Sequence, residues 1–513
     1  MKRILLLLSF ASLSVLTFCC KTPIEDENGK NDNLVPAVAS NTWLLHSLAD
    51  IESYKNEKPS NRMSLLMAKN EVENVQLVIT TATNGTLDIE RTGNENELAF
   101  ECRKLEVFEK MTDVLVPCDG RVKPQNKVLK LWLTFRTSKD TAPGKYKEVI
   151  RFKTEEDEYA VAISVNVLDV EIPEVPSLPS VFGINPDNFI MTGLNEEQKR
   201  EKRKEVADLL LDYRATPYFS TWLSGTMKTE CFSSPYTWDD FRTWEYLKDA
   251  RFNRIAFPFH GLSDEELESM LQKVKSEGLM DKAYFYLWDE PTKMAEYEQI
   301  HEMADRLHRY APEAKVITTY YRGPEDGEHV DDLFAVFDIL DGATSIFCTG
   351  VWSLQGNESR SAMCRKKLKD GQEWWSYVCM ADSPGLAQNS SGIANRVVMW
   401  RHWKEQTTGF LYWVVNSFGS MSPLKSRSGL PEGDGILVYP GEPFGAKVPC
   451  VSIRLERWRD GSEDYELLKM YEAKLGRAEA EKLLSNVYTN PTVYTKNISH
   501  VDAMKKVILE ALR

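Results

Sequence analysis

The chain has 513 residues, of which 42% are hydrophobic and 27% are charged, a composition typical of a soluble globular protein with room for two domains. Its formal net charge of −14 argues against binding to nucleic acid, because phosphate groups require a basic surface. The same charge disfavours a domain that is held on an anionic membrane by electrostatics alone. The 13 Trp, 20 Tyr and 21 Phe suit both a hydrophobic core and a carbohydrate site.

The first twenty residues have the form of a bacterial lipoprotein leader. Two basic residues precede an apolar run, 4–18, that is too short to span a bilayer comfortably, and Cys19 and Cys20 follow at once. Phe18 is larger than the small residue usual before a lipidated cysteine, so Cys20 is an alternative acceptor to Cys19. With residues 21–40 as a flexible tether, we expect an exported protein anchored through its N-terminal lipid only, on the outer membrane, in the periplasm or at the cell surface. Plain secretion is the alternative.

The sequence predicts no metal site and no cofactor. Seven cysteines follow the leader, but none forms a C-x-x-C pair, and there is no H-E-x-x-H motif and no acidic calcium loop. There is also no glycine-rich nucleotide fingerprint. Cys102 and Cys118 are the nearest pair for a disulfide, and most of the cysteines are expected to be buried thiols.

The organisation changes about one third of the way along the chain. Residues 41–172 contain alternating β-branched and aromatic runs separated by turn signals, which predict an antiparallel β-sandwich. Three prolines between residues 171 and 180 predict a stiff linker, placed at 173–180. Residues 181–513 then alternate apolar runs with helical stretches.

Eight apolar runs in the second part predict a (β/α)₈ barrel followed by C-terminal helices. Ser263 and Glu266 form a capping box, and Pro291 suits the first turn of a helix that Pro312 stops. A doubly wound sheet is the alternative architecture. The expected strands lie at 181–185, 216–222, 254–260, 283–290, 315–321, 342–348, 373–380 and 409–415.

The strand ends of a barrel carry its active site, and one of them ends in adjacent carboxylates. Asp289 and Glu290 are the last residues of an apolar strand. Desolvation there separates the pKa values of two neighbouring acids, so that one carboxyl stays protonated while the other is ionised. A protonated carboxyl near neutral pH is what general acid catalysis requires. The alternative is that Asp289 caps the following helix and Glu290 lies in its first turn.

Neighbouring acids do not match ordinary glycosidases, whose two carboxyls lie on opposite sides of the scissile bond. They suit a substrate-assisted reaction, in which the 2-acetamido oxygen of the sugar attacks the anomeric carbon. One carboxylate then orients the amide and stabilises its charge, while the other protonates the leaving oxygen.

Several segments resemble glycoside hydrolase family 123 and the related domain of unknown function 4091. They are residues 286–291 (YLWDEP), 373–379, 400–416, 433–441 and 452–468, in the same order as in the family, while 68–79 resembles its N-terminal domain. The resemblance implies an exo-acting β-N-acetylgalactosaminidase that retains configuration by the substrate-assisted route. It also implies that Asp289 polarises the acetamido group and that Glu290 is the acid/base.

Other strand-end residues are candidate contacts to a glycan with a terminal amino sugar. The Tyr320 hydroxyl is a candidate donor to the amide oxygen or the nucleophilic centre, and the alternatives are core packing for the aromatic residues, a turn for Asp434 and a structural role for the histidine. The candidates are His260, Tyr320, Trp375, Tyr377, Tyr412, Trp413, Asn416 and Asp434.

A dense charged motif between residues 454 and 464 is expected to be a structural ion-pair network that seats the final helices. Two rival functions remain open. One is a related exo-glycosidase that acts on another sugar, and the other is a non-catalytic glycan-binding lipoprotein.

Overall fold

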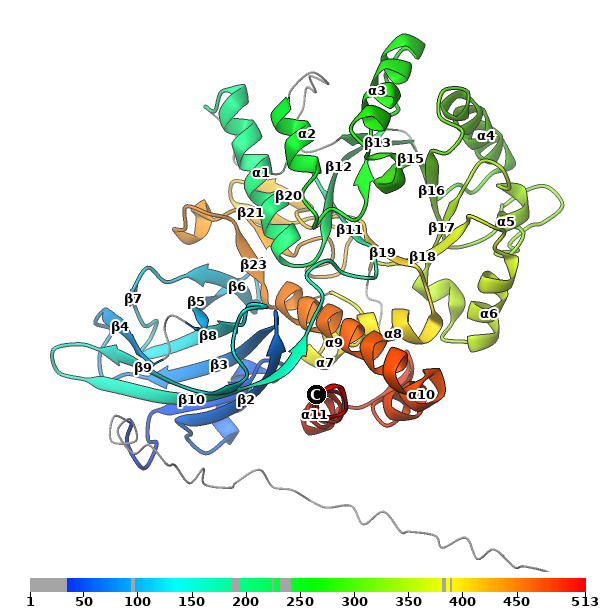
Figure 1. Ribbon diagram of the computed structural model, residues 1–513. Helices are drawn as coiled ribbons and strands as arrows, with labels where there is room; N and C mark the ends of the chain where they lie inside the picture. Colours follow the sequence, from blue (N-terminus) through cyan, green and yellow to red (C-terminus); the bar gives the residue numbers. More distant parts are fainter. Residues whose placement is uncertain are drawn as a thin grey trace, which may run out of the picture.

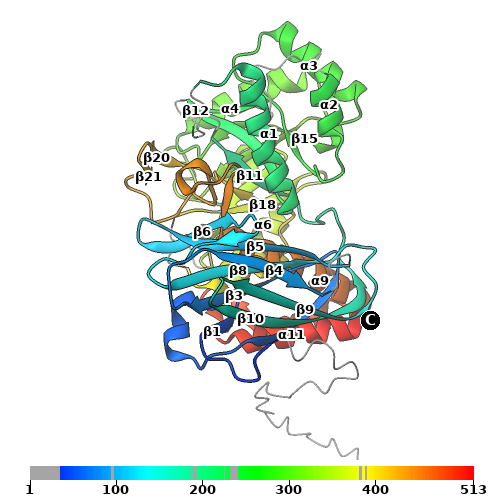
Figure 2. The ribbon, with the colours of Figure 1, turned by 90° about the vertical axis from the view of Figure 1, so that its left-hand side faces the viewer.

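The computed structural model describes residues 35–93, 97–185, 188, 193–223, 226–230, 241–380, 384–387 and 390–513. Cys19 and Cys20, on which the lipid-anchor prediction rests, lie outside these residues. The described part forms a β-sandwich and a barrel that are packed against each other (Figures 1 and 2). No helix in these ranges combines the length and the apolar character needed to cross a membrane.

The sandwich consists of two sheets. The larger sheet has seven strands, in the order β1 (Thr42–His46), β3 (Val72–Thr80), β8 (Val128–Arg136), β5 (Ala99–Phe108), β6 (Met111–Pro117), β23 (Cys450–Ser452) and β22 (Val438–Tyr439). The smaller sheet has five strands, in the order β2 (Arg62–Lys69), β10 (Glu158–Glu171), β9 (Gly144–Lys153), β4 (Leu87–Thr92) and β7 (Arg121–Val122). Neighbouring strands are antiparallel, except β2 with β10, which are parallel.

Alternating side chains of the two sheets meet in one apolar core. Leu131 and Leu133 of β8 and Ile150 and Phe152 of β9 are fully buried there, as the alternation in the sequence predicts. Strands β22 and β23 follow the barrel in sequence yet extend the larger sheet through the pairing of β23 with β6. The sandwich prediction therefore holds for the fold, with an edge supplied by the C-terminal part of the chain.

The second domain is a nearly closed barrel of eight parallel strands, as predicted. The row runs β12 (Thr216–Leu223), β11 (Ser180–Ile184), β19 (Gly409–Tyr412), β18 (Glu373–Val378), β17 (Ile346–Gly350), β16 (Lys315–Tyr320), β15 (Ala283–Asp289) and β14 (Ile255–Ala256). Its two ends, β12 and β14, lie next to each other, and β13 (Thr226–Glu230) pairs with β12 in the antiparallel sense. Each predicted apolar run supplies one strand. Strand β14 is much shorter than the run 254–260, which contains Pro258.

Helices cover the outside of the barrel and connect it to the sandwich. Those of the barrel are α1 (Glu196–Asp212), α2 (Phe241–Leu247), α3 (Asp264–Ser276), α4 (Met294–His308), α5 (Val336–Ile339), α6 (Glu358–Lys367), α7 (Gly392–Arg396) and α8 (Val398–Glu405). The C-terminal helices are α9 (Ile453–Leu475), α10 (Arg477–Ser485) and α11 (Ile498–Leu512). Ser263 and Glu266 form the predicted capping box at the start of α3.

Short elements complete the described chain. They are the 3₁₀ turns η2 (Ile51–Asn56), η3 (Met280–Lys282), η4 (Val351–Leu354) and η5 (Glu442–Phe444), and the hairpins β20 (Phe418–Met421) with β21 (Leu424–Ser426) and β24 (Tyr488–Asn490) with β25 (Val493–Tyr494).

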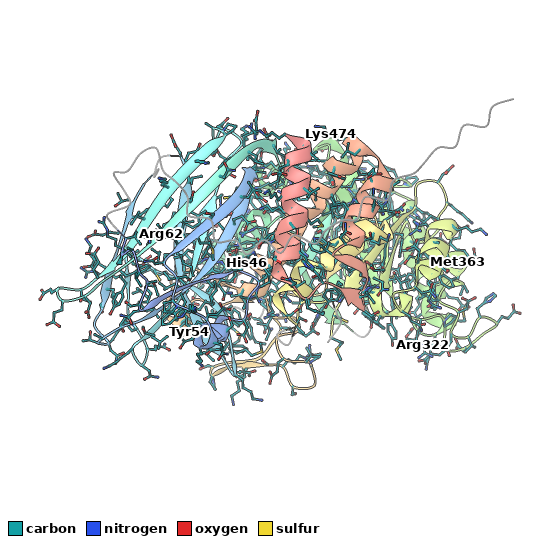
Figure 3. All side chains as sticks on the ribbon, turned by 90° about the horizontal axis from the view of Figure 1, so that it is seen from below. His46, Tyr54, Arg62, Arg322, Met363 and Lys474 are labelled. Carbon is teal, nitrogen blue, oxygen red and sulfur yellow. The ribbon has the colours of Figure 1, made fainter. Side chains whose placement is uncertain are left out.

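Helix α9 joins the two domains through buried ion pairs. Arg454 reaches Asp113 of β6 at 2.8 Å, while Arg103 of β5 pairs with Glu456 at 2.5 Å, and all four side chains are shielded from solvent. In Figure 3, helices α9 to α11 lie between the sandwich, where His46 is labelled, and the side of the barrel that carries Met363. The charged motif is structural, as predicted, but it binds the sandwich to the barrel as well as seating helices.

Candidate functional site

Asp289 and Glu290 lie together at the carboxyl end of β15, where the barrel opens. Both side chains are half-buried. Successive residues of a regular strand point to opposite faces, but Glu290 has a φ of 51°, in the left-handed region, so the strand ends there. The residues before them are buried, and this places two acids at the edge of an apolar interior.

Two hydroxyl groups hold one oxygen of Asp289. Tyr286 Oη and Thr319 Oγ1 each lie 2.8 Å from Asp289 Oδ1, and each can donate its proton to that oxygen. Thr319 Oγ1 in turn accepts the backbone N–H of Glu290 at 3.2 Å. Tyr286 and Thr319 are buried, so this network fixes the carboxyl group from inside the barrel.

Glu290 is suited to carry a proton near neutral pH. Burial raises the pKa of Glu290 to about 7, and the negative charge of Asp289 adds to the shift. The Tyr377 hydroxyl, from β18, donates a hydrogen bond to Glu290 Oε1, which acts in the opposite direction. Burial also raises the pKa of Tyr377 well above its usual value, so the phenol stays protonated and remains a donor.

An aromatic row continues outward from Tyr377. The Trp352 ring, in η4, meets the Tyr377 ring edge to face with centroids 5.1 Å apart, and Tyr321 follows at 5.9 Å from Trp352. A side chain at Gly350 would have its Cβ 2.7 Å from the Trp352 ring, so glycine is needed for this ring position. Trp352 and Tyr321 are half-buried, which leaves aromatic surface beside the acids.

Two predicted contacts are wrong because their side chains lie elsewhere. Tyr320 points outward into the helix layer, where its buried ring packs edge to face against Phe337 of α5 and Phe347. Trp375 points into the barrel but near its opposite end, where Nε1 donates to Glu373 at 2.9 Å. Glu373 is the first residue of β18.

Three candidate substrate contacts hold loops together instead. Asn416 exchanges hydrogen bonds with the backbone of Asn185, at 2.8 and 2.9 Å, and is 1% exposed. Asp434 accepts the Met380 N–H at 2.9 Å and lies 3.4 Å from both Tyr412 Oη and Trp413 Nε1. Burial raises the pKa of Asp434. These contacts correct the roles expected of Asn416, Asp434 and the buried Tyr412, while Trp413 stays half-buried at the strand end.

His260 contacts the strand that carries the acids. Its Nε2 lies 2.9 Å from the carbonyl oxygen of Leu287, two residues before Asp289. The side chain thus bonds to the backbone of β15, and the contact with substrate stays a prediction. Among the described residues, no three His, Cys, Asp or Glu side chains are grouped so as to hold a metal ion.

The sequence-based prediction missed four residues of the site. Alternation along β15 and β16 would have placed Tyr286 and Thr319 inward, since both share a face with core residues of the barrel interior. Tyr321 is the last residue of the expected strand 315–321 and directly follows β16, while Trp352 lies in the turn after β17, outside every expected strand.

Comparisons with known proteins agree with the fold and point to one family. Residues 226–471 match the model of the glycoside hydrolase 123 catalytic domain. A family 123 glycoside hydrolase from Clostridium perfringens, from a structural analysis of glycolipid glycan hydrolysis, is 14% identical and has a TM-score of 0.65, covering 92% of this chain and 97% of that one. No curated protein matches the chain in sequence.

Two other solved structures match the chain with low TM-scores. A putative beta-galactosidase from Bacteroides fragilis has a TM-score of 0.29 at 12% identity, covering 72% of this chain and 56% of that chain. A GH2 beta-galacturonidase from Eisenbergiella tayi has a TM-score of 0.34 at 9% identity, covering 77% and 69%. These scores are too low to indicate a common fold over the whole chain. The family match and the paired acids lead to one conclusion: residues 226–471 are similar to the catalytic domain of glycoside hydrolase family 123, and the protein is a glycoside hydrolase.

Proposed function

We propose that the protein releases terminal β-linked N-acetylgalactosamine, or a close 2-acetamido sugar, by exo-acting, retaining, substrate-assisted hydrolysis. One observation carries the proposal: two adjacent carboxyl groups lie at the end of the same strand, and they have different surroundings. Asp289 is fixed by two hydroxyls, whereas burial raises the pKa of Glu290 to about 7.

The position of the acids supports a nucleophile that comes from the substrate. Conventional mechanisms place two carboxyls about 5 to 9 Å apart, on opposite sides of the scissile bond. Neighbours on one strand approach the sugar from one side, which leaves the far face of the anomeric carbon to the acetamido oxygen. That oxygen forms the new bond to the anomeric carbon while the bond to the leaving oxygen breaks.

Each acid then has a separate task. Glu290 gives its proton to the leaving oxygen, and the resulting carboxylate later takes a proton from the water that opens the cyclic intermediate. Asp289 orients the amide N–H and stabilises the positive charge of the oxazolinium intermediate. Two inversions at the same carbon release the sugar with retained configuration.

Hydrolysis of three aryl glycosides, β-GalNAc, β-GlcNAc and β-Gal, tests the proposal. We expect kcat/KM on an acetamido sugar to exceed that on the plain galactoside by at least about 10³-fold, because the galactoside lacks the internal nucleophile. Equal rates on β-GalNAc and β-Gal would contradict the acetamido mechanism. Binding of glycans without any product would instead favour a non-catalytic protein.

The N-terminal sequence supports a further part of the proposal, an exported lipoprotein anchored through Cys19 or Cys20. Fractionation of cells that express the full chain tests it. The double substitution of Cys19 and Cys20 by serine should move the protein from the membrane fraction to the soluble fraction, and unchanged membrane association would contradict lipidation.

A further inference from the structure

Strand β15 contains a bulge just before the two acids. Its pairing with β16 is regular from Tyr284 to Tyr286, then skips Leu287 and resumes with Trp288 opposite Thr318 and Asp289 opposite Thr319. Bulges are rare between parallel strands and are typical of barrel rims near active sites, where they redirect side chains.

The bulge determines which way Asp289 points. Tyr284 and Tyr286 belong to the barrel interior, and strict alternation would bring Trp288 inward next and turn Asp289 outward. Instead, Leu287 and Trp288 both pack in the outer layer. Asp289 is thereby on the inner face, where it meets Tyr286 and Thr319.

His260 supplies a hydrogen bond at the bulge. Strand β14 ends at Ala256, so the loop after it, rather than a strand, lies beside this part of β15. Leu287 has no place in the pairing with β16, and its carbonyl oxygen lies 2.9 Å from His260 Nε2. A carbonyl oxygen only accepts, so Nε2 carries the proton and donates. Leu287 is fully buried, so its backbone carbonyl needs a hydrogen-bond donor, and His260 supplies one.

Helix α4 fixes the loop that carries His260. Arg306 donates to the carbonyl oxygen of Leu262 at 2.7 Å and to Asp264 at 2.6 Å, and its guanidinium lies 5.1 Å from the centre of the Phe259 ring. Burial lowers the pKa of His260, the bond to Leu287 acts in the other direction, and the charge of Arg306 also lowers it. The imidazole is thus held by its loop as a neutral donor.

We propose that His260 is a positioning residue: by holding the Leu287 carbonyl it maintains the bulge that aims Asp289 and Glu290 at the same side of the barrel mouth. The proposal rests on the function proposed above for the two acids. His260 acts through the backbone of β15, whereas a substrate contact would act on the sugar directly.

The test compares His260→Phe with a matched histidine. His301 of α4 is also half-buried and also lies within hydrogen-bond distance of a backbone carbonyl, that of Ile339 at 2.6 Å, but this carbonyl belongs to α5 and not to β15. In the full chain, His260→Phe should lower kcat by about 100-fold, which is the effect expected of a misplacement of about 1 Å. His260→Gln keeps an N–H donor, so its kcat should be at least about tenfold higher than that of His260→Phe. His301→Phe should leave kcat near the wild-type value.

The pH dependence of kcat separates positioning from general destabilisation. Glu290 must be protonated to act as the acid, so activity falls as the pH rises through its pKa. Moving Glu290 out of its buried place beside Asp289 lowers that pKa, and the basic limb of the His260→Phe profile should shift to lower pH. His301→Phe should keep the wild-type kcat and pH profile. The proposal would be overturned if His260→Phe also kept both and only lowered the melting temperature.

A crystal structure of His260→Phe provides a test that does not depend on activity. We expect a changed β15 register and loss of the contact between Glu290 and Tyr377. An unchanged bulge with both acids in place would refute the positioning role even if the sugar specificity proposed above is correct. A wild-type protein that is inactive on every 2-acetamido glycoside would refute the proposed function. The crystal structure of His260→Phe would still decide whether His260 holds the bulge.

Discussion

Replacing Glu290 by Gln is expected to lower kcat by about 10³-fold on substrates with poor leaving groups, which is within the usual range for loss of a general acid. The loss should shrink to about tenfold for a dinitrophenyl glycoside, because that leaving group departs without a proton. Glu290 can supply the proton to poor leaving groups because its pKa is raised to about 7, which keeps part of the Glu290 population protonated near neutral pH. A series of aryl 2-acetamido glycosides with leaving groups of different pKa measures the effect.

A second half-buried glutamate of the same barrel, Glu373, serves as the control. Glu373 lies at the opposite end of the barrel and pairs with Arg254 at 3.0 Å and with Lys315. Glu373→Gln should lower the melting temperature, because it removes the charge that pairs with two half-buried cations, but should not change the dependence of kcat on the leaving group. A Glu290→Gln variant that loses activity equally on all leaving groups would show that Glu290 does not supply the proton.

Replacing Asp289 by Asn is expected to lower kcat by about 10² to 10³-fold on every leaving group. Asparagine keeps an oxygen that accepts from Tyr286 and Thr319, so the substitution removes the charge while retaining the hydrogen bonds. The charge stabilises the oxazolinium ion, which forms whichever leaving group departs. The same aryl series measures the loss, and a strong dependence on the leaving group would contradict the assigned role.

The pH profile of Asp289→Asn gives an independent check. The charge of Asp289 raises the pKa of Glu290, so its removal should shift the basic limb of kcat to lower pH. Tyr377→Phe should shift this limb to higher pH, because the lost hydrogen bond stabilises the ionised form of Glu290. Shifts of opposite sign are expected, and shifts of equal sign would show that a group other than Glu290 titrates.

The fold could be predicted from the sequence because its signals are local. Runs of β-branched and aromatic residues predicted all eight barrel strands, and the capping box at Ser263 predicted the start of α3. The pairing of β23 with β6 could not be predicted, since residues 450–452 and 114–115 are far apart in the sequence and only three-dimensional folding brings them together.

The candidate site could be predicted only as far as the strand ends. The chain positions of Asp289 and Glu290 follow from the strand pattern, but the bulge at Leu287 and the φ of Glu290 decide where they point. Alternation along β16, with Ile317 in the barrel interior, would have placed Tyr320 outward, but the sequence does not show how the chain turns at Tyr321 after the strand ends. The carboxyl and amide groups of Asp434 and Asn416 looked available for substrate, yet loop backbones occupy them.

The central claim is that the acetamido group of the substrate is the nucleophile and that the two acids assist its attack. Binding of a galacto-configured acetamido-thiazoline, which imitates the cyclic intermediate, tests this claim most directly. We predict competitive inhibition of the wild-type enzyme with a Ki at least about 10²-fold below the KM for the aryl 2-acetamido glycoside, and much weaker binding to Asp289→Asn, which lacks the charge that stabilises the intermediate. No inhibition, or equal affinity for wild type and Asp289→Asn, would contradict the claim.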